Sequence, residues 1–130
     1  MVIIFKETSI LMTIRYTNEF VKQLCNTEKA AKIFFHNMRY YEDLQSLINL
    51  IEQSPTLSDL IAFSHLHFHS TDFFKKHSYG LDIGGRKSQY RLIVIPLDDN
   101  ENIIVKDEDF YKRCKSIRVL SIEEVSKHYE

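Results

Sequence analysis

The segment that most constrains the fold is a nearly continuous apolar run, YRLIVIPL, at residues 90–97. An apolar run of this length, without alternation, is typical of a strand that is covered on both faces. Pro96 limits how the strand can pair near its end, because proline has no backbone N–H. Other elements must therefore pack on both sides of this strand. The 130 residues are enough for one such domain, 1–130, with a buried core.

The chain ahead of this strand begins with a short extended segment and a short helix. Residues 13–16, TIRY, predict a first strand with Ile14 and Tyr16 on one side. Thr17 or Asn18 can accept a hydrogen bond from the first turn of a helix over 18–25. Its apolar side chains are spaced to form one buried face.

A longer helix follows almost at once. Thr27 can cap a helix from about residue 28 to residue 53, in which apolar side chains recur at intervals of three and four. Ser54-Pro55 ends it, because the residue before a proline avoids helical geometry. Thr56 can cap one further turn, LSDLI. We therefore predict an N-terminal helical hairpin.

The apolar period changes to two from residue 64 onward. Strands are expected from residue 64 to 69, at 79–83, at 90–97, weakly at 102–105, and at 117–120. Ser121 opens the sequence S-I-E-E, a capping-box pattern that predicts a short C-terminal helical turn. The order of elements predicts an α+β domain with helices packed on one face of a small, mostly antiparallel sheet.

The charge of the chain is balanced in sum but not in distribution. Seventeen basic and eighteen acidic side chains give a net charge of −1, which by itself does not indicate nucleic-acid binding. The acids concentrate at 98–109, and basic residues concentrate between Lys75 and Arg91. We therefore hypothesise that the acidic stretch folds back over the basic patch and screens its charge. A local basic patch is what phosphate binding requires, although a solvated surface is the alternative. The patch consists of Lys75, Lys76, Arg86, Lys87 and Arg91.

The sequence favours a cytoplasmic protein. Cys25 and Cys114 form no disulfide framework and are expected to be reduced thiols. No segment has the roughly 18 apolar residues of a membrane-spanning helix. The apolar start is interrupted by Lys6 and Glu7 and lacks a signal-peptide cleavage site. Residues 1–11 are either a start-site extension or an extra edge strand.

An ordered set of motifs, spread over nearly the whole chain after Met12, resembles one protein superfamily. IRYTNEFVKQL resembles its first strand and helix, and TLSDLIAFSHLHFH its helix end and second strand. YGLDI followed by YRLIVIP resembles its paired central strands, and IRVLSIEEVSKHYE its closing strand and tail. The superfamily is that of the RelE/ParE toxins, and within it the HigB-like "plasmid maintenance killer" toxins of bacterial toxin–antitoxin pairs.

This resemblance implies a ribosome-associated endoribonuclease that cuts messenger RNA and is neutralised by an antitoxin, expected to be a helix-turn-helix protein. RNA brings its own nucleophile, the 2′-OH, so no metal or other cofactor is required. The protein must deprotonate that hydroxyl, stabilise the phosphate charge and protonate the leaving oxygen. No membrane is involved.

The resemblance also assigns residues. Arginine suits the phosphate because its planar fork can hold two oxygens, and histidine or tyrosine suits proton transfer. An alternative for Arg91 is an ion pair with Asp82 across the sheet. The expected catalytic residues are Arg91, His67, His128 and Tyr129, and the expected phosphate-binding residues are Lys75, Lys76, Arg86 and Lys87.

Departures from the family pattern leave two other functions open. Ser70 stands where a lysine is expected, Lys127 replaces an acid in the tail, and the loop that begins at residue 70 is longer. A non-catalytic binding protein, or a toxin with another target such as gyrase, is therefore an alternative. The third interpretation is a metal site: on one strand face His65, His67 and His69 could supply two imidazole ligands, with Asp72 or His77 beside them.

Overall fold

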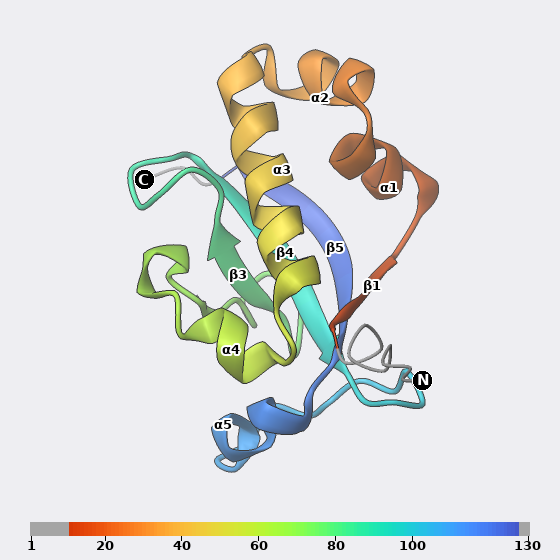
Figure 1. Cartoon of the computed structure of the whole chain (residues 1–130), viewed down its shortest axis with the longest axis vertical. Helices are drawn as coiled ribbons and strands as arrows, with labels where there is room; N and C mark the ends of the chain where they lie inside the picture. Colours follow the sequence, from red (N-terminus) through yellow and green to blue (C-terminus); the bar gives the residue numbers. More distant parts are fainter. Residues whose placement is uncertain (1–10, 128–130) are drawn as a thin grey trace, which may run out of the picture.

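The computed structural model describes residues 11–127 as an α+β fold in which N-terminal helices pack on a five-stranded mixed, mostly antiparallel sheet (Figure 1). The strand order is β1-β5-β4-β3-β2, and only β1 and β5 run parallel. The central position of β4 confirms the expectation for YRLIVIPL. The strands are β1 (Thr13–Tyr16), β2 (His69–Ser70), β3 (Tyr79–Asp82), β4 (Tyr90–Leu97) and β5 (Val119–Lys127).

The helices begin where the sequence predicts caps. Asn18, Thr27 and Thr56 each accept a hydrogen bond from the first turn of the helix that follows, and Thr56 forms a full capping box with Asp59. Figure 1 shows α3 lying across one face of the sheet. The helices are α1 (Glu19–Asn26), α2 (Glu28–Phe35), α3 (Met38–Gln53), α4 (Leu57–Ile61) and α5 (Phe110–Arg113), with short 3-10 turns η2 (Ser64–Leu66) and η3 (Cys114–Ser116).

The core lies between these helices and the sheet. Leu44 and Ile51 of α3 are fully buried against Leu81 of β3 and Leu92 of β4. Burial of each such side chain stabilises the fold by roughly 1.5–3 kcal/mol. Because side chains alternate along a strand, Arg91 points to the opposite face of the sheet. That opposite face carries the candidate site.

The single helix predicted over 28–53 is wrong, because the chain breaks at His36 and Asn37. His36 ends α2 in the left-handed conformation (φ 58°), and the Asn37 side chain caps α3 by accepting from Arg39 N. The break lets Phe35 at the end of α2 pack edge-on against Tyr90 of β4, with ring centroids 4.8 Å apart. Aromatic packing and an available cap thus override the helical periodicity.

The strand predicted from residue 64 to 69 is also mostly wrong. Residues 64–66 form η2, His67 is left-handed (φ 49°), and β2 contains only His69 and Ser70. Leu66 is buried without a strand, and Phe68 stacks on Tyr79 with centroids 4.6 Å apart. The alternation of apolar residues is satisfied by this packing instead of by strand pairing.

The C-terminal third differs from expectation in two places. The weak strand predicted at 102–105 is a single bridge between Leu97 and Ile103. The short helix of this part is α5, whereas Ser121 lies inside β5 and its hydroxyl donates to Glu123. A β-bulge at this point leaves Glu123 unpaired between the partners of Ile93 and Val94. Ile122 and Val125 are buried, and this burial favours the strand over a helical turn.

Candidate functional site

The candidate site is a small cavity on the sheet face opposite α3, beside the β3–β4 hairpin. Its volume is about 190 Å³. This is below the roughly 300 Å³ at which pockets for whole small molecules begin, so the cavity suits one group of a larger ligand. The lining contains two histidines, two phenylalanines and two arginines: His67, His69, Phe73, Phe74, Arg86 and Arg91.

Arg91 is held rigidly at the centre of the site. It lies directly opposite Asp82 in the β3–β4 register, and its Nε is 2.9 Å from Asp82 Oδ1. Its Nη1 donates to the carbonyl oxygens of Ser88 at 2.7 Å and Tyr90 at 2.9 Å. The ion pair with Asp82, which the sequence offered as an alternative role for Arg91, is therefore present. Nη2 forms no hydrogen bond with residues 11–127, and the Arg91 side chain lines the cavity.

Asp82 is a buried carboxylate that several cations surround. It is only 2% exposed, and neither of its oxygens accepts a well-aligned hydrogen bond from the described residues. Besides Arg91, it has Arg86 Nε at 3.7 Å and His67 Nδ1 at 3.7 Å. A buried carboxylate without aligned hydrogen bonds depends on nearby positive charge, which Arg91 and Arg86 supply here, and His67 lies beside them.

His67 occupies an unusual position in this cluster. Its left-handed backbone is uncommon for a residue other than glycine, and such conformations concentrate at functional sites. Its Nδ1 is buried without a hydrogen-bond partner among the described residues. Burial lowers the His67 pKa, and the positive charges of Arg86 and His69 lower it further, while Asp82 opposes them. The lowered pKa favours the neutral imidazole, which can accept a proton.

His69, which the sequence suggested only as a metal ligand, completes the pair. Its ring stacks on that of His67 with centroids 4.6 Å apart. Its Nδ1 is 2.7 Å from the His67 carbonyl oxygen, which can only accept, so Nδ1 carries a proton, and Nε2 forms no hydrogen bond with residues 11–127. Gly80 lies beneath this ring, since a Cβ there would be 3.0 Å from His69 Cε1. A glycine opposite the histidine is the sequence feature that makes room for the ring.

The predicted cations divide between two environments. Arg86 lines the cavity and is 67% exposed, so it can move toward a ligand. Lys75 pairs at 2.8 Å with Glu123, the bulge residue of β5, and is not among the residues that line the cavity. Lys76 and Lys87 are exposed and form no ion pair with the described residues. His128 and Tyr129 lie outside the described residues.

Among residues 11–127, no acid of the stretch 98–109 forms an ion pair with the basic patch. Glu101 pairs with Arg15 at 2.9 Å, and Asp107 pairs with Arg113 at 3.1 Å. The acids that contact the patch are Asp82 and Glu123 instead. No contact of this kind supports the screening hypothesis for 98–109, which stays a prediction.

The metal interpretation loses its geometric basis. His65 lies in η2 and His67 is left-handed, so the three histidines do not share one strand face. Among residues 11–127 no group of three or more His, Cys, Asp or Glu side chains is arranged to hold a metal ion.

The comparisons with known proteins give no relative. No protein-family model, no curated protein and no solved structure matches the chain. In the part of the chain that the structure describes, no helix combines the length and hydropathy needed to cross a membrane.

Proposed function

We propose that the protein is a metal-independent endoribonuclease, the toxin of a cytoplasmic toxin–antitoxin pair that cuts messenger RNA on the ribosome. The observation that carries the proposal is the convergence of His67, His69, Arg86 and Arg91 on one small cavity. Neutral imidazole beside fixed and mobile guanidinium groups is a suitable set for cleaving a phosphodiester. The RelE/ParE resemblance supplies the biological setting, including a helix-turn-helix antitoxin.

The chemistry follows from the positions of these groups. Arg91 and Arg86 bind the non-bridging phosphate oxygens. His67 Nδ1 is on the side of Asp82, so its Nε2 takes the proton of the 2′-OH. The 2′-oxygen then bonds to phosphorus while the bond to the 5′-oxygen breaks. The products are a 2′,3′-cyclic phosphate and a 5′-OH.

The leaving oxygen needs a separate proton donor. In this proposal the stacked pair of His67 and His69 supplies the base, with His67 accepting the proton. His128 or Tyr129 is the donor that the family resemblance assigns. Ser126, two positions before His128 in the sequence, lines the cavity.

A second function is favoured by one observation, the ion pair between Arg91 and Asp82. Because the carboxylate already neutralises this arginine, the site could bind a phosphate or a partner without cleaving RNA. This is the non-catalytic alternative, which includes action on another target such as gyrase.

The test is induction in a bacterium, with growth and 5′-OH ends of messenger RNA followed together. We expect arrest with new 5′-OH ends from the wild type, and neither from His67→Asn or Arg86→Ala. Arg118→Ala is the matched control, an exposed arginine at the opposite end of β5. Arrest with intact messenger RNA would favour another target, and no arrest at equal protein levels would refute the toxin assignment.

A further inference from the structure

We propose that Phe73, with Phe74 beside it, is a stacking platform for an unpaired base, which makes single-stranded RNA the substrate. This inference rests on the proposed function, because it places a nucleobase next to the phosphate that Arg86 and Arg91 hold. Both phenylalanines line the same cavity as the two arginines.

The exposure of these rings is the first argument. Phe73 is 82% exposed, the highest value among the exposed large apolar side chains of the described residues, and Phe74 is 42% exposed. Neither ring stacks on another aromatic residue within 11–127. An aromatic side chain kept in water beside two guanidinium groups contributes little to the core, and its position suits the face of a ligand ring.

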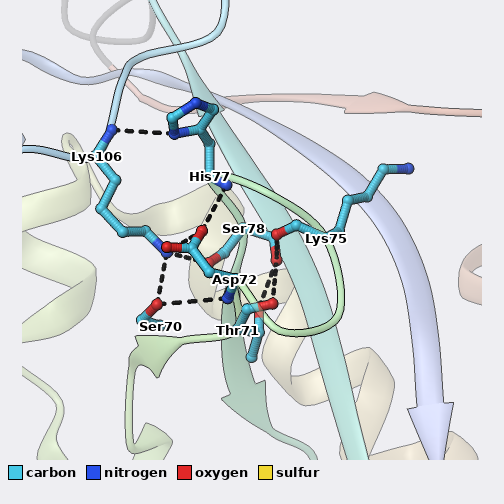
Figure 2. A network of polar contacts seen from close by, with 7 residues as sticks. All are labelled: Ser70, Thr71, Asp72, Lys75, His77, Ser78 and Lys106. Atoms are coloured by element: carbon cyan, nitrogen blue, oxygen red, sulfur yellow. Dashed lines mark hydrogen bonds and ion pairs between the residues drawn. The ribbon is translucent and has the colours of Figure 1, made fainter.

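The loop that carries the two rings is held firmly, as Figure 2 shows. Lys106 reaches across from another loop and donates to Ser70 Oγ at 2.7 Å, Asp72 Oδ1 at 3.0 Å and the Ser78 carbonyl at 2.8 Å. Asp72 in turn accepts from His77 N at 2.7 Å.

The inner side of the same loop is tied as well. The Thr71 and Ser78 hydroxyls are hydrogen-bonded to each other (Figure 2). The Thr71 carbonyl accepts from the backbone N–H groups of Phe74 at 2.8 Å and Lys75 at 3.0 Å. A preorganised loop loses little conformational entropy when a ligand stacks on it. The exposed ring therefore stands on a fixed base.

The size of the cavity favours a strand over a free nucleotide. About 190 Å³ admits a phosphate and part of a sugar, while the base has to lie at the open rim, where Phe73 is exposed. Every base has a face that can stack, whereas a duplex hides its bases between neighbours. Because Arg86 and Arg91 bind the phosphate while Phe73 needs an accessible base face, the site favours unpaired nucleic acid.

The experiment is fluorescence anisotropy with a labelled single-stranded 2′-deoxy oligonucleotide, which lacks the 2′-OH and is not cleaved by the proposed reaction. We expect Phe73→Ala to weaken binding roughly 5- to 100-fold and Phe73→Tyr to retain it. Phe20→Ala is the control, since Phe20 is 64% exposed on α1, away from the cavity. An oligonucleotide with abasic sites is expected to bind the wild type as weakly as the intact one binds Phe73→Ala.

The outcomes separate the platform from the proposed function. If the wild type binds in a manner that requires Arg86 but Phe73→Ala changes nothing, the platform is overturned and the proposed function stands. Phe73 would then be available for an apolar side chain of a partner protein. If duplex binds as tightly as single strand, the substrate class is wrong. If the wild type binds neither oligonucleotide nor the matching RNA, the proposed function fails and the platform with it.

Discussion

Removing the charge of Arg91 is expected to destabilise the protein far more than removing that of Arg15. Each arginine has a nitrogen 2.9 Å from a carboxylate oxygen, but the surroundings differ. The side chains of Arg91 and Asp82 are 12% and 0% exposed, whereas those of Arg15 and Glu101 are 48% and 47% exposed. The comparison therefore isolates burial at constant distance.

The magnitude follows from what remains around Asp82. Arg91→Met keeps the apolar stem and leaves the carboxylate with Arg86 and His67, each at 3.7 Å. Breaking a buried ion pair by removing one partner costs about 3–5 kcal/mol. An exposed pair contributes less than about 1 kcal/mol, so Arg15→Met serves as the control. Against a usual total of about 5–15 kcal/mol, the loss at Arg91 is large.

Urea unfolding of a double-mutant cycle measures this coupling. The cycle contains wild type, Arg91→Met, Asp82→Asn and the double variant. We expect the double variant to be more stable than the sum of the single losses predicts, by at least about 1 kcal/mol, since both buried charges are then absent. Additive losses, or equal costs for Arg91→Met and Arg15→Met, would refute the reasoning.

Three further predictions concern the site and its supporting loop. The pKa of His67 is lower in the folded than in the unfolded chain, so stability is expected to fall as the pH drops below about 6.5. His67→Asn, which tolerates the left-handed backbone, flattens that decline in thermal unfolding. Gly80→Ala places a Cβ about 3.0 Å from His69 Cε1, so we expect it to displace the His69 ring and lower activity while the free energy of unfolding changes little; activity assays and urea unfolding measure the two effects. Lys106→Met removes a side chain that is 18% exposed and bonded to Ser70, Asp72 and Ser78. We expect the free energy of unfolding to fall by about 1–3 kcal/mol and backbone hydrogen exchange at 71–78 to become faster.

Local rules predict much of this fold. Asn18, Thr27 and Thr56 cap helices because their side-chain oxygens satisfy backbone donors, and this requirement needs no tertiary information. The apolar run of β4 likewise predicts a central strand, because both of its faces need cover.

The errors arise where distant contacts compete with local periodicity. The apolar spacing continues across His36, yet the chain turns there so that Phe35 meets Tyr90, more than fifty positions away. Phe68 alternates with histidines as in a strand, but it stacks on Tyr79 instead. Contacts of this kind cannot be deduced from a window of neighbouring residues.

The site could be predicted in part. Arg91 and Asp82 were recognised as possible partners because the two predicted strands flank one short loop. The places of His69 and Phe73 in this site depend on Gly80 and on the Lys106 network, which join segments far apart in sequence, so local patterns do not reveal them. The short H-x-H and F-F patterns are the only local indications of either residue.

Asp82 gives the proposed site a definite physical character. Its negative charge opposes a phosphate, so Asp82→Asn is expected to bind the 2′-deoxy oligonucleotide more tightly even though it unfolds more easily. The same carboxylate holds Arg91 in a fixed orientation. A donor that is already oriented stabilises the charge that develops on the phosphate without having to rearrange first. Arg86, whose side chain is exposed, then supplies the adjustable contact. Weaker binding by a folded Asp82→Asn variant would contradict this account. It would mean that orienting Arg91 contributes more to affinity than the negative charge of Asp82 takes away.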